Sequence, residues 1–251
     1  MANGCISTDR ILEKLDEYLN KNDYASAERH LLYWLSEAET NSDNRTLLLM
    51  SNELMGLYRK LGRRDDAIGF AEKALKKIEE LDIGEQVGSA TTYLNSATVY
   101  KAFGMADRSM PLFEKAKQIY ESSLKEDDDR LAGLYNNMAL SLVDLGRFDE
   151  AGSYYKKAIS IMEKAEDGAP NIAITYLNMA SAAEAEVGLC DGAELIGEYL
   201  EKAKELLEGY GKRDGYYAFV CEKCASVFGY YGHFFYENEL KERAKAIYER
   251  N

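Results

Sequence analysis

Apolar positions along the chain recur with the period of an α-helix, and the same pattern returns from one segment to the next. It is clearest over residues 131–170, where two amphipathic segments flank a turn at Gly146. The apolar faces consist of Tyr135, Ala139 and Leu142 in the first segment and of Ala151, Tyr155, Ala158 and Met162 in the second. Each face alone would remain in water, so the pattern predicts stacked copies that bury one another.

The turn residue between the two helices of each copy gives the repeat period. It recurs about every 42 residues, a spacing typical of repeat architectures. The turn residues are Asn22, Gly62, Gly104, Gly146, Gly188 and Gly232. Glycine and asparagine suit the left-handed conformation just past a helix end. Six turns predict twelve helices, and no segment shows the alternation of a strand, so the expected fold is all-α.

Short motifs before three of these turns carry a family resemblance. They read Tyr93-Leu94-Asn95-Ser96-Ala97, Tyr135-Asn136-Asn137-Met138-Ala139 and Tyr176-Leu177-Asn178-Met179-Ala180. The chain resembles the tetratricopeptide repeat, and its long unit and the run at 170–173 are similar to the subclass found in kinesin light chains. The fifth unit departs from the pattern by about three extra residues, expected between Ala193 and Ala203.

This resemblance implies a right-handed superhelical solenoid of about six antiparallel helix pairs, in which the first helix of each pair, helix A, lines a concave groove. The whole chain, 1–251, is then a single tetratricopeptide-repeat domain. Its expected units are 8–42, 46–83, 88–126, 130–168, 171–209 and 214–251. The second helix of each pair is called helix B below.

The charge of the chain restricts its partners. A net charge of −13 argues against nucleic acid and against an anionic membrane surface, since both are bound mainly through Lys and Arg. A basic segment would be attracted, although a solvated acidic surface is the alternative interpretation. The densest acidic run, residues 126–129, precedes a helix A, and we expect it to cap that helix rather than to bind a metal.

Nothing in the sequence indicates catalysis, a metal or a cofactor. Cys221 and Cys224 form the one suggestive motif, but their register puts both on the packing face of a helix A. A zinc site needs four ligands, and only Cys190, His30 and His233 are further candidates. We therefore expect a protein that is not an enzyme. The residues at 1–10 lack an apolar targeting segment, which together with four scattered cysteines predicts a cytoplasmic protein.

Three asparagines of the A helices are the candidate binding residues. Asn95, Asn137 and Asn178 each precede the small residue of the motif by two, which turns them away from the packing face. The resemblance places them along the groove, where an amide can pair with the main chain of a peptide. Alternatively, they bond to each other or to neighbouring A helices. Arg59 and Lys101 lie a turn further along and complete the candidate set, without restoring the carboxylate clamp of chaperone-binding repeats.

The predicted function is a non-catalytic scaffold whose groove binds a protein or an extended peptide. One alternative is a structural subunit that forms a homodimer through the last unit, because nine aromatic residues crowd that unit. They are Tyr216, Tyr217, Phe219, Phe228, Tyr230, Tyr231, Phe234, Phe235 and Tyr236. Such a cluster commonly marks an interface when it stays exposed. A peptide-sensing regulatory module is a further alternative.

Overall fold

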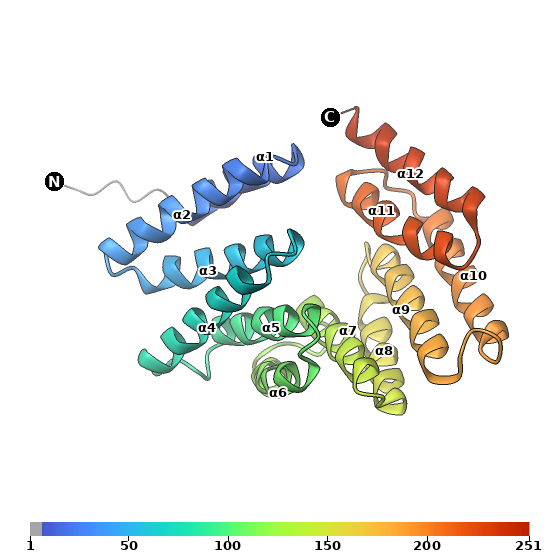
Figure 1. Ribbon diagram of the computed structural model, residues 1–251, viewed down its shortest axis with the longest axis horizontal. Helices are drawn as coiled ribbons and strands as arrows, with labels where there is room; N and C mark the ends of the chain where they lie inside the picture. The colour runs from blue at the N-terminus through green and yellow to red at the C-terminus, as the bar shows by residue number, and fades with distance from the viewer. Residues whose placement is uncertain (1–6, 251) are drawn as a thin grey trace. The chain divides into compact units, whose positions relative to one another are not determined.

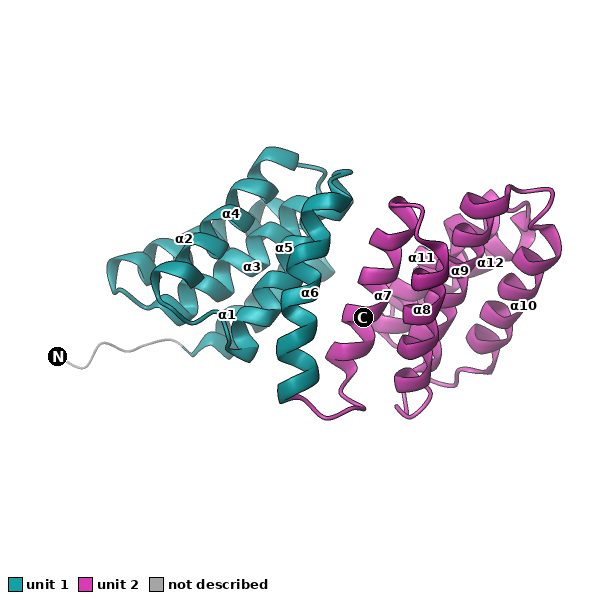
Figure 2. Cartoon of the chain, turned by 90° about the horizontal axis from the view of Figure 1, so that it is seen from below, with its two compact units in different colours: residues 1–123 teal, residues 124–251 magenta. Residues whose placement is uncertain are grey.

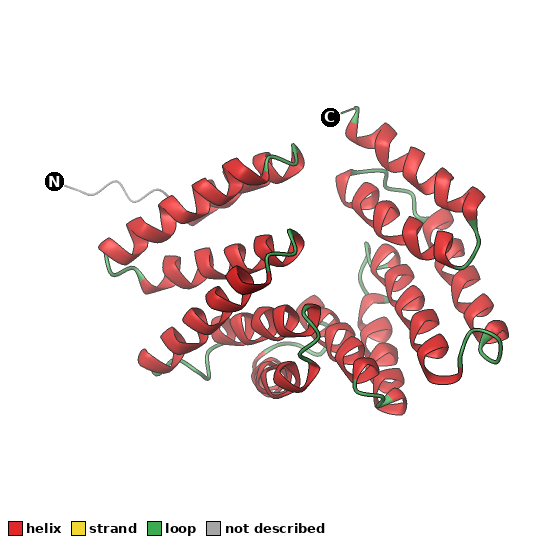
Figure 3. Ribbon diagram, in the orientation of Figure 1, coloured by secondary structure: helices red, strands yellow, loops and turns green. Residues whose placement is uncertain are grey.

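The computed structural model describes residues 7–250, and every regular element in that range is an α-helix (Figures 1 and 3). Twelve helices are found there, and consecutive helices form antiparallel pairs. The chain divides into two compact units, Met1–Ser123 and Leu124–Asn251, coloured teal and magenta in Figure 2. The prediction of an all-α fold built from six helix pairs is confirmed.

The first unit contains three helix pairs, and one apolar core joins the first five of its helices. Its helices are α1 (Thr8–Asn20), α2 (Tyr24–Thr40), α3 (Asn44–Lys60), α4 (Arg64–Glu80), α5 (Val87–Ala102) and α6 (Ala106–Ser123). Ala67, Ala71 and Ala74 of α4 are completely buried. Small side chains on this face shorten the distance between helix axes, so α4 packs closely against both α3 and α5.

The second unit has the same organisation and a larger aromatic core. Its helices are α7 (Asp129–Asp144), α8 (Phe148–Met162), α9 (Ala169–Val187), α10 (Ala193–Gly209), α11 (Gly215–Tyr230) and α12 (Phe234–Tyr248). Tyr217 and Phe228 of α11 are buried in a cluster that extends from Ala173 to Ile247. The three A helices α7, α9 and α11 contact one another in sequence, since α9 packs against both of the others.

All six predicted turn residues have the positive φ expected of them, and Gly188 differs from a left-handed helical residue only in its extended ψ of 164°. Their φ angles are 53° at Asn22, 68° at Gly62, 75° at Gly104, 71° at Gly146, 86° at Gly188 and 84° at Gly232. At Gly146 this conformation lets the next amide, of Arg147, donate to the carbonyl of Leu142 at 2.9 Å. The bond satisfies a carbonyl that the end of α7 would otherwise leave unpaired.

The fifth helix pair departs from the others in its turn and not in its second helix. Helix α8 begins two residues after Gly146, whereas α10 begins at Ala193, five residues after Gly188. The added residues form a wider turn in which the amide of Gly192 donates to the carbonyl of Gly188 at 3.0 Å. Their expected position between Ala193 and Ala203 is therefore wrong, because α10 runs through that range without interruption.

The backbone of two glycines in the same helix pair gives a stability test. Gly146 has a φ of +71°, so Gly146→Ala should lower the free energy of unfolding by about 1–2 kcal/mol. Gly152 lies inside α8, where Gly152→Ala should raise it by about 0.5–1 kcal/mol. A Cβ at either position meets no atom within 4 Å, so neither substitution causes a steric clash and only the backbone effect differs. Urea unfolding of both variants measures the difference, and equal effects would contradict the backbone argument.

Candidate functional site

A hydrogen-bonded bridge of two asparagines and a threonine joins neighbouring A helices in the first unit. The amide nitrogen Nδ2 of Asn52, on α3, donates to Oγ1 of Thr92 on α5 at 2.9 Å. Asn95, one turn further along α5, donates from its own Nδ2 to Oδ1 of Asn52 at 3.0 Å. Both the donor and the acceptor of the Asn52 side chain are therefore used between the two helices.

The second unit repeats this amide bridge between α7 and α9. The Oδ1 atom of Asn136 accepts hydrogen bonds from Oγ1 of Thr175 and from Nδ2 of Asn178, both at 3.2 Å. Thr175 is buried, and its hydroxyl also lies 3.0 Å from the carbonyl oxygen of Asn171. In both units an asparagine of one A helix meets a threonine and an asparagine, three residues apart, on the next.

Asn137 does not share the environment of the other two candidate asparagines. Its Nδ2 donates to the carbonyl oxygen of Gly133, within its own helix, at 2.8 Å. The residue three positions earlier is the buried Leu134, where the bridged helices have a threonine. Bonding to a neighbouring A helix is thus observed for Asn95 and Asn178, whereas a peptide contact stays a prediction for all three.

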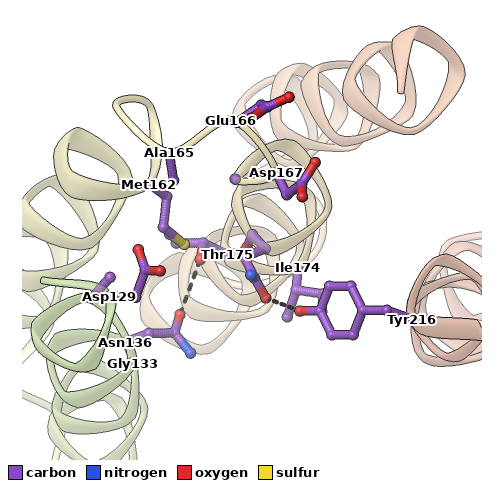
Figure 4. A pocket seen from close by; sticks show the side chains of 13 residues that line it. Asp129, Gly133, Asn136, Met162, Ala165, Glu166, Asp167, Ile174, Thr175 and Tyr216 are labelled. Atoms are coloured by element: carbon purple, nitrogen blue, oxygen red, sulfur yellow. Dashed lines mark hydrogen bonds between the residues drawn. The ribbon is translucent and has the colours of Figure 1, made fainter. Parts of the chain in front are cut away.

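A cavity of about 460 Å³ opens in the second unit beside the amide bridge (Figure 4). It is bounded by α7, the loop between α8 and α9, the first half of α9, and the start of α11. Its lining residues are Asp129, Ala132, Gly133, Asn136, Met162, Ala165, Glu166, Asp167, Gly168, Asn171, Ile174, Thr175 and Tyr216. The cavity therefore lies on the A-helix side of the last three helix pairs.

The loop between α8 and α9 holds two carboxylates at the cavity. Its last residue, Gly168, packs so closely that a Cβ there would overlap the carbonyl oxygen of Met162. This close approach turns the chain directly into α9 and leaves Glu166 and Asp167 exposed beside the cavity (Figure 4). A glycine is required at this position for steric reasons, although its φ is negative.

The carboxylates around the cavity differ in their partners. Asp167 accepts from Nζ of Lys212 at 2.5 Å and from Oη of Tyr210 at 3.2 Å, and the hydrogen bond from Lys212 lowers the pKa of Asp167. Asp129 and Glu166 form no ion pair with any residue of the described range 7–250. The cavity therefore presents two carboxylates whose charge is not neutralised by a bonded cation.

The predicted capping role of the acidic run is confirmed at Asp128. Its side chain accepts from the backbone amide of Arg130 at the start of α7, as an N-cap does. The guanidinium of Arg130 also donates to Asp128, at 2.7 and 2.8 Å, and these hydrogen bonds lower the pKa of the carboxyl to about 2. Asp128 is occupied by the cap, while its neighbour Asp129 faces the cavity.

The two basic candidates lie at helix ends in the first unit. Arg59 is exposed in the last turn of α3, and Lys101 is half-buried in the last turn of α5. A positive charge at the end of a helix is favoured by the helix dipole. Neither residue is among those that line the cavity, which belongs to the second unit.

The cysteine motif packs as its register predicts. Cys221 and Cys224 are completely buried in the core of the second unit, and burial raises the pKa of both thiols, to about 12 for Cys224. Cys190 is an exposed free thiol in the wide α9–α10 turn, and Cys5 lies outside the described residues. Between residues 7 and 250, no three side chains of metal-ligating type form a group.

The aromatic residues of the last helix pair divide between core and surface. Tyr217, Phe228 and Tyr236 are buried, and Tyr231 is half-buried. The other five are exposed, namely Tyr216, Phe219, Tyr230, Phe234 and Phe235. More than half of the nine rings therefore stay exposed on the described structure.

Comparison with known proteins identifies the repeats. The family model for the tetratricopeptide repeat matches residues 130–198, which contain the cavity's α7 and α9. This part of the chain matches the tetratricopeptide repeat. Such repeats form scaffolds that generally mediate protein interactions and are typically non-catalytic. No helix in the described part of the chain is long and apolar enough to cross a membrane.

The chain is similar to proteins named as kinesin light chains or as related to them. Protein KINESIN LIGHT CHAIN-RELATED 2 of Arabidopsis thaliana is 25% identical over 174 residues, which are 68% of this chain and 25% of the relative. The chain thus spans about a quarter of the length of that relative. The structure of BtubC (BKLC) from P. vanneervenii has a TM-score of 0.67 at 23% identity, covering 81% of this chain and 82% of that one.

A further structural match agrees on the fold. The kinesin light chain of Podosopora anserina with nearly identical TPR-like repeats gives a TM-score of 0.55 at 17% identity, with 80% of this chain and 94% of that chain covered. At such low identities the likeness concerns the fold alone. The likeness therefore assigns no role to the residues of the cavity or of the amide bridges.

Sequence reasoning missed the partners of the bridge asparagines and the cavity acids. Asn52 and Asn136 sit one residue before the predicted asparagine position, on the side that meets the next A helix. The sequence does contain a signal for the amide bridge. In the unit after Asn52 and in the unit after Asn136, the next A helix carries a Thr-x-x-Asn motif, which begins at Thr92 and at Thr175. The carboxylates of the cavity come from a helix start and a loop, which no repeat motif describes.

Two adjacent asparagines allow the amide bridge to be tested. Asn136→Ala removes the acceptor of two hydrogen bonds between helices, so it should lower the free energy of unfolding by about 1–2 kcal/mol. Asn137→Ala removes one contact within its own helix and should change it by no more than about 0.5 kcal/mol. Thermal and urea unfolding of both variants give the comparison. A larger loss for Asn137 would show that the bridge does not brace the helices.

The environments of the cysteines predict their reactivity. Iodoacetamide on the native protein should modify Cys190 and leave Cys221 and Cys224 unmodified, because the two buried thiols combine inaccessibility with a raised pKa. Peptide mass mapping after a short labelling pulse measures this, with urea-unfolded protein as the positive control. Addition of zinc or of a chelator should leave the melting temperature unchanged. One tightly bound zinc per chain would contradict the packing role.

Proposed function

We propose that this chain is a non-catalytic scaffold that binds an extended protein segment bearing Lys or Arg, in the cavity along α7, α9 and α11. The observation that carries the proposal is the combination, in one cavity, of amide groups with two carboxylates that have no ion-pair partner in the described range. A chain of net charge −13 attracts a positively charged segment. Amide groups can form hydrogen bonds with the main chain of that segment and so fix its position along the cavity.

Each group at the cavity has a task in this proposal. Asp129 and Glu166 would take the ammonium or guanidinium groups of the segment, since neither has an ion-pair partner in the described range. Asn171 offers an exposed amide to the main chain. The exposed ring of Tyr216, whose hydroxyl donates to Asn171, gives a face for a cation or an aliphatic stem (Figure 4).

The candidate asparagines extend the proposal along the A helices. We propose that Asn178 and Asn137 contribute main-chain contacts next to the cavity, and that Asn95, with Arg59 and Lys101, does so in the first unit. For Asn95 and Asn178 this requires the amide to share its hydrogen bonds with the bridge already described. Free cysteines at 190, 221 and 224 fit a reducing compartment, which supports a cytoplasmic location.

A charge-removing double variant tests the proposed function. Asp129→Asn with Glu166→Gln keeps side-chain size and removes both uncompensated charges. The control pair, Asp149→Asn with Glu201→Gln, removes two exposed charges from B helices of the same unit. The probe is a fluorescent nonapeptide of alternating Lys and Ser, compared with one of alternating Glu and Ser. Fluorescence anisotropy measures the dissociation constants at low and at physiological salt.

We expect the lysine probe to bind the native chain and to bind the cavity variant about tenfold more weakly, which corresponds to about 1.4 kcal/mol. The control variant should lose much less, because its charges lie away from the cavity and are screened at physiological salt. An equal loss of affinity in the two variants would show that the probe is held only by the net charge of the chain, and would contradict the proposal. Preference for the glutamate probe would overturn the proposal.

A further inference from the structure

Six large apolar side chains remain exposed at the turns of the last two helix pairs. They are Val187, Leu189, Leu195, Tyr230, Phe234 and Phe235, and we call them the turn-edge patch. Phe235 is 94% exposed and Tyr230 is 69% exposed. Large apolar side chains that stay exposed on one part of a surface commonly mark a site of protein interaction.

Hydrogen bonds between α9 and α11 bring the two turns together. Glu184, in the last turn of α9, accepts from Oη of Tyr230 at 2.7 Å and from Oη of Tyr231 at 2.8 Å. Both tyrosines end α11, so the C-terminal ends of the two A helices are held side by side. The α9–α10 turn and the α11–α12 turn that follow these ends therefore lie on the same edge of the unit.

The exposure of Phe235 is a property of its position in the repeat. The corresponding residues of earlier units are Asp65 on α4 and Asp149 on α8, and both are exposed although a further helix, α5 or α9, packs against theirs. An acidic residue in the first turn of a helix is stabilised by the helix dipole, whereas a phenylalanine there is not. Phe235 thus neither fills the core of its unit nor supports its helix, and its ring is available for contact with a partner.

Acidic residues flank the turn-edge patch on its α9–α10 side and restrict its occupant. Glu186, Asp191 and Glu194 are exposed in and beside the α9–α10 turn, and none forms an ion pair with a residue in the range 7–250. If the patches of two copies met, these like charges would be brought together, which costs free energy. Charge complementarity instead favours an occupant that carries positive charge next to its apolar side chains.

We infer that the turn-edge patch docks a protein segment in which two or three large apolar side chains are flanked by Lys or Arg. The exposed rings supply the anchoring contacts that dominate such interfaces, and the acidic rim selects the flanks. This surface is separate from the cavity, because Asn171 and Val187 lie at opposite ends of α9, about 24 Å apart along the helix. The two surfaces can thus be tested independently.

The test uses defined peptide probes on the intact chain and resolves where each binds. The first probe has a Leu-Phe-Leu centre flanked by two Lys on each side. The second has the same centre flanked by Glu, and the third has an Ala-Ala-Ala centre flanked by Lys. Amide chemical-shift changes locate binding, and titration gives the dissociation constant. The variant is Phe235→Asp, which installs the residue type found at Asp65 and Asp149 and should preserve the helix.

We expect the first probe to shift amides of the two turns that carry the patch, and to bind at least about tenfold more tightly than either other probe. Phe235→Asp should remove this advantage. The matched control, Tyr33→Asp, changes an aromatic side chain that is 58% exposed on α2 and should have no effect. The cavity variant Asp129→Asn with Glu166→Gln should bind the first probe at the turn-edge patch with unchanged affinity. This result separates the inference from the proposed function.

Three outcomes would overturn the inference. Equal affinity for the Lys-flanked and Glu-flanked probes would remove the role of the acidic rim. Shifts confined to the cavity would place the basic probe there alone. Sedimentation that shows a concentration-dependent dimer, lost in Phe235→Asp, would make a second copy the occupant and would support the homodimer that the crowded aromatic residues also predict.

Discussion

The structure depends on helices that cannot bury their apolar faces alone. Each described helix buries part of its surface against its neighbours, and a pair still leaves a face that only the next pair can cover. Close stacking requires small side chains where helix B meets its neighbours, and alanines occupy those positions, as Ala67 and Ala74 do in α4 and Ala151 and Ala158 do in α8. Stacking buries apolar faces between the helix pairs, whereas polar groups on the A helices stay available for other contacts.

The amide bridges show what those polar groups do when stacking brings them together. An asparagine at half-buried depth must find partners, because an unpaired amide there loses its hydrogen bonds to water without replacement. Asn52 and Asn136 satisfy this need across adjacent A helices. Apolar packing tolerates small slips between helices, whereas a hydrogen bond does not, so the bridges fix how two A helices lie against each other.

Local features of the fold were predictable, and features that depend on contacts between units were not. The turn at Gly146 is determined by a backbone conformation of one residue, so its position could be read from the sequence. The wider turn after Gly188 was placed too late, because alanine spacing cannot distinguish added residues in a turn from added residues in a helix. For the asparagines the residues were predicted but not their partners, since Asn95 and Asn137 look alike until the neighbouring helix is known.

Helix α9 illustrates how one element can serve two surfaces with different chemistry. Its first turns, with Asn171 and Thr175, contribute amide and hydroxyl groups to a cavity between carboxylates. Its last turn, with Glu184, ties down the tyrosines of α11 and leads into an apolar edge. At the proposed cavity site, recognition of a cation would rest on charge and hydrogen bonds, which weaken with salt, whereas burial of rings at the other end would not. A partner that contacted both ends would gain from effective concentration, provided that its two binding segments span the length of α9.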